Sequence, residues 1–262
     1  MTRVAKHKGS FYSDNCQEII NQINRFTDIM MSALPNKNFL NYEPRAIISP
    51  HAGYIYSGFT ANIAHQLLAN TTAKRIIVIG PSHYVGFNGI SGSFYDRYET
   101  PCGYLAIDKE YLEIIKNKFN IKFVTKTHQQ EHSTETQMPL IKHYHKDKKI
   151  IELIYGKSSN LANLIKFLLK DKDNALVIST DLSHFHTLKK ANQIDKNCLD
   201  GVYNQDLNLL KKCEACGYDG LIAMVQVAKE MKLNIELLDY RTSYDYSKDK
   251  NRVVGYMSAV VL

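Results

Sequence analysis

The sequence predicts an α/β protein, a layered fold with a largely parallel central sheet flanked by helices. Short β-branched apolar runs alternate along the chain with segments in which apolar residues recur at helical spacing. This alternation is typical of parallel sheets, because neighbouring parallel strands need a crossover connection that is usually a helix. The 262 residues contain no internal repeat, low-complexity tract or linker rich in Gly, Pro or Ser. We therefore expect one domain over residues 1–262, a length that α/β folds reach undivided.

The individual elements follow from local pattern. The first helix opens with the capping residues Ser13-Asp14-Asn15, and Pro35 is expected to end it. The clearest strand is the run 75–80, because its four central residues are all Ile or Val. In chain order we expect a helix at 13–34, a strand at 45–50, a helix at 57–69, a strand at 75–80, helices at about 108–118 and at 132–145, a strand at 149–155, a helix around 161–169, a strand at 175–180, two or three helices within 187–231, and strands at 235–240 and 252–261.

The charge balance and the apolar runs argue against two classes of partner. Lys and Arg exceed Asp and Glu by 33 − 26 = 7, and the isoelectric point is near 9.0. The densest basic stretch, 142–149, lies at an expected helix end, where lysines complement the helix dipole and face water. We therefore expect no nucleic-acid partner. We also expect no membrane association, because no apolar run approaches the roughly 18 residues of a membrane helix.

The cysteines predict a reducing compartment. They stand at 16, 102, 198, 213 and 216, so they are sparse and odd in number. The first twelve residues carry charges with no apolar stretch behind them, which is not the pattern of a signal peptide. We expect thiols and not a disulfide framework, and a cytoplasmic protein.

Three histidines follow the ends of expected strands. His51 comes after the run 45–50, His83 after 75–80, and His184 after 175–180. The carboxyl ends of parallel strands share one edge of a sheet, and ligands bind at that edge. Imidazole is both the commonest metal ligand and an acid–base group suited to neutral pH. The alternative is that these are ordinary strand-exit turns whose histidines face solvent, but three equivalent positions favour a site.

Two further clusters remain ambiguous from the residues alone. Glu131-His132-Ser133 is either a helix start or part of the same sheet edge, where it would supply a proton acceptor or a substrate contact. Cys213 and Cys216 form a lone Cys-x-x-Cys, with no second pair for a structural zinc site. Cys216 is therefore either a metal ligand or a buried thiol. Motifs for a serine hydrolase, a phosphate loop or a dinucleotide site are absent.

Seven motifs occur in the order found in Memo family proteins, whose bacterial and archaeal members are called AmmeMemoRadiSam system protein B. They are Ser-Pro-His-Ala-Gly-Tyr-Ile-Tyr-Ser-Gly from 49, Gly-Pro-Ser-His from 80, Tyr-Glu-Thr-Pro-Cys-Gly from 98, Glu-His-Ser-Thr-Glu-Thr-Gln-Met-Pro from 131, Ser-Thr-Asp-Leu-Ser-His from 179, Ala-Cys-Gly from 215 and Val-Val-Gly-Tyr from 253. The chain therefore resembles this family over most of its length.

The resemblance implies a fold similar to that of the class III extradiol dioxygenases, which open catechol rings with non-haem Fe(II). It implies a metal site formed by His51, His83 and Cys216, with His184, His132 and Asp181 nearby in acid–base or supporting roles. The dioxygenases use two histidines and a carboxylate, whereas this site would hold a softer thiolate that also suits copper. Ring cleavage itself is therefore not expected. The family's Cys-Gly is usually followed closely by a proline, which this chain lacks at 218–220.

The leading hypothesis is a mononuclear non-haem iron protein with redox or oxygen-dependent chemistry on an unknown small molecule. Fe(II) is the expected cofactor, with copper and zinc as alternatives, and His184 would accept a proton from the substrate. The alternative is a non-catalytic adaptor that binds a peptide or a partner protein in the same cleft. A metal-dependent hydrolase is less favoured because no carboxylate pair stands at suitable positions. The resemblance also suggests AMMECR-type and radical-SAM proteins as partners.

Overall fold

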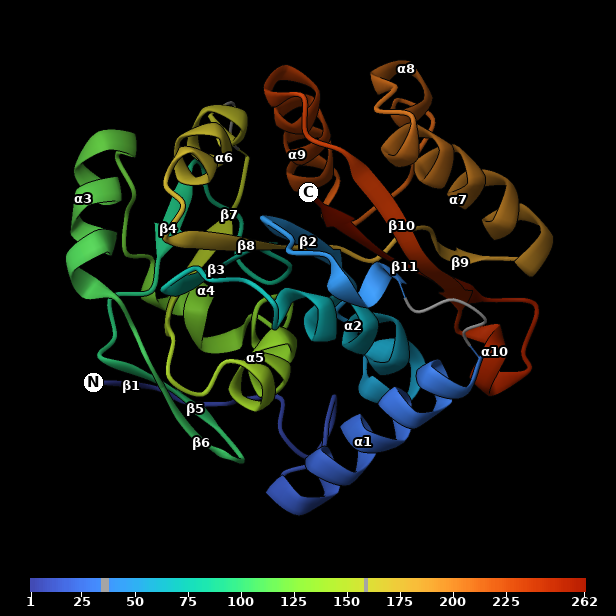
Figure 1. The fold of residues 1–262 in the computed structure, drawn as a ribbon, viewed down its shortest axis with the longest axis horizontal. Coiled ribbons are helices and arrows are strands. Elements are labelled where there is room, and N and C mark those ends of the chain that lie inside the picture. Colours follow the sequence, from blue (N-terminus) through green and yellow to red (C-terminus); the bar gives the residue numbers. More distant parts are fainter. Residues whose placement is uncertain (34–37, 158–159) are drawn as a thin grey trace.

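A mixed sheet forms the centre of the protein (Figure 1). The computed structural model describes residues 1–33, 38–157 and 160–262. Within these residues the strand order is β10-β11-β2-β8-β3-β7-β4, and β9 pairs with β11 outside that path. The strands are β2 (Ala46–Ser49), β3 (Arg75–Pro81), β4 (Ile90–Gly92), β7 (Lys149–Tyr155), β8 (Asn174–Ser179), β9 (His184–His186), β10 (Ile235–Thr242) and β11 (Val253–Val261).

The predicted parallel centre of the sheet is confirmed. β2, β8, β3 and β7 pair in parallel, whereas β11, β10, β9 and β4 are added antiparallel at the two sides. The central strands are apolar on both faces, and Ile76, Ile77, Val78 and Ile79 are each 0% exposed. Such continuous apolar runs are expected where helices cover both faces of a sheet.

Helices lie on both faces of the sheet, as Figure 1 shows. α1, α2 and α5 lie on one side and α6, α7 and α9 on the other. The helices are α1 (Cys16–Ala33), α2 (Tyr54–Leu68), α3 (Lys109–Phe119), α4 (Thr125–Gln130), α5 (Met138–Tyr144), α6 (Leu161–Lys170), α7 (Leu188–Tyr203), α8 (Leu207–Leu210), α9 (Tyr218–Met231) and α10 (Tyr244–Ser247), with the 3-10 turns η1 (Asn38–Asn41) and η2 (Glu135–Gln137). None of the described helices combines the length and the apolar character that crossing a lipid bilayer requires.

Most of the expected elements are present, and the differences are local. The helix expected at 132–145 starts later, because residues 132–134 form a turn before η2 and α5. The expected end of the first helix, at Leu34 and Pro35, lies outside the described residues. A small sheet of β1 (Thr2–Arg3), β5 (Arg97–Thr100) and β6 (Gly103–Ala106) was not anticipated. β1 has only two residues, which is too short for any periodicity to reveal.

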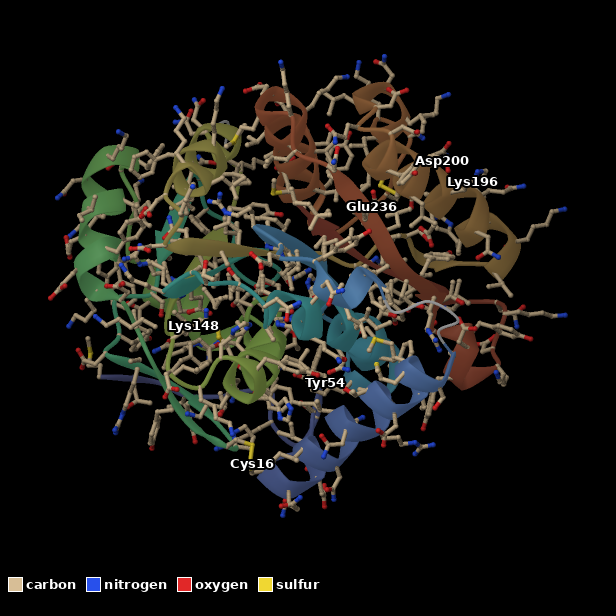
Figure 2. The ribbon with its side chains drawn as sticks, viewed as in Figure 1. Cys16, Tyr54, Lys148, Lys196, Asp200 and Glu236 are labelled. Atoms are coloured by element: carbon tan, nitrogen blue, oxygen red, sulfur yellow. A yellow bond between two sulfur atoms is a disulfide. The ribbon has the colours of Figure 1, made fainter. Side chains whose placement is uncertain are left out.

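The prediction that all five cysteines are thiols is wrong for four of them. Cys16 is joined to Cys102, and Cys198 to Cys213. Figure 2 labels Cys16 at the start of α1, where the first disulfide ties this helix to the turn between β5 and β6. The sparse spacing was misleading because each pair is distant in sequence and meets only in the fold. Cys216 is the remaining free thiol.

Candidate metal centre

Three histidines meet at the carboxyl end of the parallel strands. His51 follows β2, His83 follows β3 and His132 precedes η2. One potential ligand atom from each ring lies within 4.8 Å of those of the other two. The ring centroids of His51 and His83 are 5.2 Å apart, and those of His83 and His132 are 4.4 Å apart. β2 and β3 both flank β8 in parallel, and this is why their following loops converge.

Cys216 lies beside this histidine cluster. Its Sγ is 3.2 Å from Nε2 of His51, and the backbone N–H of Asp181 points to the same sulfur at 3.2 Å. The close approach depends on Gly217, because a Cβ there would lie 2.6 Å from the Cβ of Thr180 at the end of β8. Burial and the charge of Asp181 raise the pKa of the Cys216 thiol, and the backbone N–H lowers it only in part, so the thiolate would form when a metal ion binds.

The tautomer of His51 is fixed by a buried network. The hydroxyl of Ser179 donates to the carbonyl of Ser133, so its oxygen accepts the Nδ1–H of His51 at 2.9 Å. The amide nitrogen of Gln137 donates to the same hydroxyl oxygen at 3.0 Å and to the Pro50 carbonyl at 2.8 Å. A carbonyl can only accept, so both donors are assigned without ambiguity. The lone pair of His51 therefore lies on Nε2, facing Cys216.

The amide oxygen of Gln137 extends the network inward. It lies 2.8 Å from Nε2 of His65, which must carry the hydrogen because the oxygen can only accept. His65 and Gln137 are both 0% exposed. The orientation of His51 is thus held by a chain of buried groups that reaches α2.

His83 is held by a carboxylate in a similar way. Its Nδ1 is 2.7 Å from Oε1 of Glu131, and its backbone N–H donates to Oε2 of the same carboxylate at 2.6 Å. Burial raises the pKa of Glu131, but the hydrogen bond and charge of His83 and further backbone N–H donors outweigh it and lower the pKa to about 2. A carboxylate on Nδ1 of a histidine is the usual support for a metal-binding Nε2.

Two histidines of this cluster, His51 and His132, are kept neutral. Burial, followed by the nearby charge of His83, lowers the pKa of His51 well below its usual value. Burial and the neighbouring His51 and His83 lower the pKa of His132 to about 3. Nδ1 of His132 has no hydrogen-bond partner among the described residues, although Oε1 of Glu131 lies 3.4 Å away. Neutral imidazoles with available lone pairs are the protonation state that metal binding requires.

Asp181 and His184 border the cluster without joining it. The carboxylate of Asp181 accepts the backbone N–H of His51 at 2.7 Å, and burial raises the pKa of this carboxyl. His184 does not follow β8 directly but begins the short strand β9. Its Nδ1–H donates to the Leu182 carbonyl at 2.7 Å, which leaves the lone pair on Nε2. His184 is half-buried and close enough to lower the pKa of His51 through its charge.

The N-terminal segment completes one wall of the site, and the sequence analysis did not identify it. The Phe11 ring lies 4.9 Å from the His132 ring, and the His7 ring lies 5.7 Å from it. Glu135 holds this segment in place, because its buried carboxylate accepts the backbone N–H of His7 and the hydroxyl of Tyr12, the residue after Phe11. A possible signal was the Phe11-Tyr12 pair after Gly9-Ser10, an aromatic cluster outside any predicted element.

A cavity opens on the Cys216 side of the cluster. Its volume is about 530 Å³, within the range of roughly 300–1,000 Å³ that small-molecule sites occupy. Cys216 and Asp219 form one part of its wall, and the loop after β3 and the end of β7 form the rest. The free thiol therefore lies between the histidines and a space large enough for a small molecule.

Comparison with known proteins places these residues in a wider context. A family model described as Memo-like protein matches residues 3–260. A MEMO1 family protein of Methanobrevibacter smithii is 30% identical, covering 99% of both chains, and one of Thermotoga neapolitana is 31% identical, covering 97% of both. Protein memo-1 homolog of Caenorhabditis elegans is 26% identical, covering 99% of this chain and 82% of its own.

Proposed function

This chain belongs to the Memo family, and from that premise we propose that it binds a single metal ion, Fe(II), through His51, His83 and Cys216. The observation that carries the proposal is the direction of the donor atoms. Nδ1 of each histidine is tied to a protein partner, and Nε2 of His51 faces Sγ of Cys216 at 3.2 Å. Two imidazole nitrogens and a thiolate suit iron, and they also suit copper or zinc.

The residues around the proposed ligands support the same reading. The Asp181 N–H stabilises the thiolate, and Glu131 and Ser179 hold the two imidazoles in orientation. His132 lies within the histidine cluster with an unpartnered Nδ1, so it is available to the ion or to a substrate. The close set of potential ligands in the structure is His51, His83 and His132, and Cys216 reaches it through His51.

We propose redox or oxygen-dependent chemistry on a small molecule held in the cavity beside Cys216. A bound iron ion would supply the redox chemistry and the activation of oxygen. His184 would accept a proton at Nε2 from a substrate hydroxyl, since Leu182 holds the hydrogen on Nδ1. Proton transfer to a positioned base contributes roughly 10²–10⁴-fold in rate. The similarity in fold to the extradiol dioxygenases belongs to this proposal, whereas cleavage of a catechol ring does not, because a thiolate replaces their carboxylate.

Metal analysis tests whether His51 and Cys216 bind an iron ion. Protein purified anaerobically without added metal is expected to contain about one equivalent of iron, and His51→Ala and Cys216→Ser are expected to retain less than about a tenth of it. His143→Ala on α5, outside the cluster, is the matched control and should retain the wild-type content. Unchanged metal in both ligand variants would reject the assigned ligands.

Oxygen consumption separates an enzyme from an adaptor. Fe(II)-loaded protein is presented with a panel of catechols and thiols, and His184→Ala is expected to slow any turnover by roughly 10²–10⁴-fold. No uptake with any compound, together with recovery of a protein partner, would favour the adaptor that uses the same cleft. AMMECR-type and radical-SAM proteins are the proposed partners for that recovery.

Ser179→Ala tests the support of His51. The variant leaves the Nδ1–H of His51 without its acceptor, so the affinity for Fe(II) is expected to fall by about 10- to 100-fold. Competition with a chelator under anaerobic conditions measures this change. Ser258→Ala removes a hydroxyl that is equally buried but has no partner among the described residues, and it should leave the affinity unaltered.

We propose the cytoplasm as the location of the protein. A free Cys216 thiol supports this location, because reducing compartments keep thiols reduced. The two disulfides point in the opposite direction, because such bonds are rare in reducing compartments. Fractionation of cells followed by detection of the protein decides between the compartments.

A further inference from the structure

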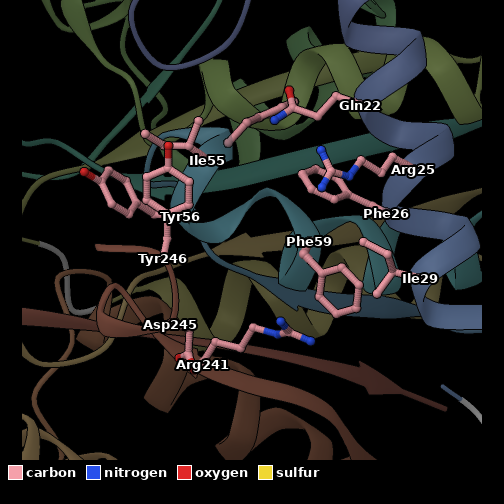
Figure 3. Close-up of a pocket in the computed structure, with 11 residues that line it drawn as sticks. Gln22, Arg25, Phe26, Ile29, Ile55, Tyr56, Phe59, Arg241, Asp245 and Tyr246 are labelled. Atoms are coloured by element: carbon pink, nitrogen blue, oxygen red, sulfur yellow. The ribbon is translucent and has the colours of Figure 1, made fainter. Parts of the chain in front are cut away.

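A second pocket lies between α1, the start of α2 and the end of β10, away from the histidine cluster (Figure 3). Its volume is about 420 Å³, which is in the range of small-molecule sites. The wall is largely aromatic and aliphatic, formed by Phe26, Phe59, Tyr56 and Ile55 among others. Ile55 is 53% exposed, so this apolar surface is accessible to a ligand.

Arg241 lies on this wall with its charged end available. Its Nε is paired with Asp239 at 3.1 Å, and its guanidinium lies over the Phe59 ring at 3.9 Å from the centroid. These two contacts hold the planar group in one orientation. Neither terminal nitrogen, Nη1 or Nη2, has a bond partner in the described part of the chain, and 39% of the side chain is exposed. A fixed guanidinium with two free NH₂ groups is suited to bind a carboxylate with two parallel hydrogen bonds.

The other charges at the pocket favour an anionic ligand. Arg25 of α1 lines it as a second cation, and no ion pair or hydrogen bond holds its side chain among residues 1–33, 38–157 and 160–262. Asp245 is an acidic residue that also lines the pocket, and its carboxylate accepts the backbone N–H of Thr242 at 2.8 Å. A cationic ligand is disfavoured because Arg241 already occupies the face of Phe59 and two guanidinium groups would repel it.

We propose that this pocket binds a small amphipathic carboxylate. The apolar body of the ligand packs against Phe26, Phe59 and Tyr56, and its carboxylate accepts hydrogen bonds from Nη1 and Nη2 of Arg241. Arg25 adds a second positive charge at the rim. The site is independent of the proposed metal centre, because none of its residues belongs to the histidine cluster.

Binding of 4-phenylbutyrate to metal-free protein tests the proposal, with 4-phenylbutanamide as the uncharged analogue. The acid is expected to bind about 10- to 100-fold more tightly than the amide, because a hydrogen-bonded ion pair to arginine replaces a neutral contact. Arg241→Met is expected to weaken binding of the acid by the same factor. Its affinity for the amide should stay within about twofold of the wild-type value. Titration calorimetry measures both ligands, and circular dichroism confirms that each variant is folded.

Two further variants separate the charge from the apolar wall. Arg97→Met is the matched control, because Arg97 is also stacked on an aromatic ring, at 4.0 Å from the Tyr104 centroid, but lies on β5 outside the pocket. It should bind the acid as the wild type does. Ile55→Ser should weaken binding of the acid and of the amide equally, because it removes only an apolar contact. The proposal is overturned if the amide binds the wild type as tightly as the acid, or if Arg241→Met retains the preference for the acid.

Discussion

Glu135→Ala is expected to lower the free energy of unfolding by about 3–5 kcal/mol, since it leaves a buried arginine without its ion-pair partner and with only the more distant charge of Glu152. Glu135 is 0% exposed and Arg3 is 1% exposed, and Nη1 of Arg3 lies 3.1 Å from Oε2 of the carboxylate. The same carboxylate accepts the backbone N–H of Lys6 at 3.0 Å and the hydroxyl of Tyr12 at 2.8 Å. The variant therefore removes the carboxylate to which Arg3, Lys6 and Tyr12 of the N-terminal segment all bind.

Urea denaturation followed by circular dichroism measures this loss. The double variant Arg3→Met/Glu135→Leu is the control, because it replaces both charges with apolar groups of similar size. It is expected to be more stable than Glu135→Ala, since no uncompensated charge stays buried. A loss below about 1 kcal/mol for Glu135→Ala would show that water reaches Arg3 and that this segment is not anchored by the ion pair.

Removal of the Cys16–Cys102 disulfide is expected to destabilise the protein by about 4 kcal/mol. The bond joins residues separated by 86 positions, and a cross-link over a long loop restricts the unfolded chain more than one over a short loop. The Cys198–Cys213 disulfide spans a separation of 15 and is expected to contribute about 3 kcal/mol. The paired alanine variants should therefore rank in this order.

Mass spectrometry checks the pairing that this ranking assumes. Denatured but unreduced protein should take up one alkyl group, on Cys216, and reduced protein should take up five, the total number of cysteines. Alkylation of Cys16 before reduction would contradict the long-loop cross-link. Equal stability of the two alanine pairs would instead contradict the dependence on loop length.

The sequence revealed the parallel core because the core strands carry a strong local signal. Runs such as 75–80 are apolar on both faces and appear where expected, as β3 does at Arg75–Pro81. The elements that were missed depend on distant partners. β9 spans three residues and exists because it pairs with β11, and β1 exists because it pairs with β5. No local pattern encodes such pairings, and the same holds for both disulfides.

For the candidate site, the sequence predicted only that the histidines following the ends of strands come together. His51 and His83 follow the parallel strands β2 and β3, which lie on either side of β8, so their approach follows from topology. Placing Cys216 required the family resemblance, because it stands on the loop before α9 and reaches His51 only through the close packing of Gly217 on β8. The contribution of Phe11 could not be derived, because its neighbours His7 and Tyr12 are held by Glu135, a buried carboxylate far away in the sequence.

The anchoring of Arg3 by Glu135 has a consequence for how the chain matures on the ribosome. Translation proceeds at roughly 5–20 residues per second, so on the order of 10 s separates the synthesis of residue 3 from that of its counter-charge. β1 likewise cannot pair until Arg97, its partner in β5, has been synthesised. Arg3 and Phe11 thus reach their final surroundings only after residue 135 has been made, and the wall that Phe11 gives to the histidines forms no earlier than that.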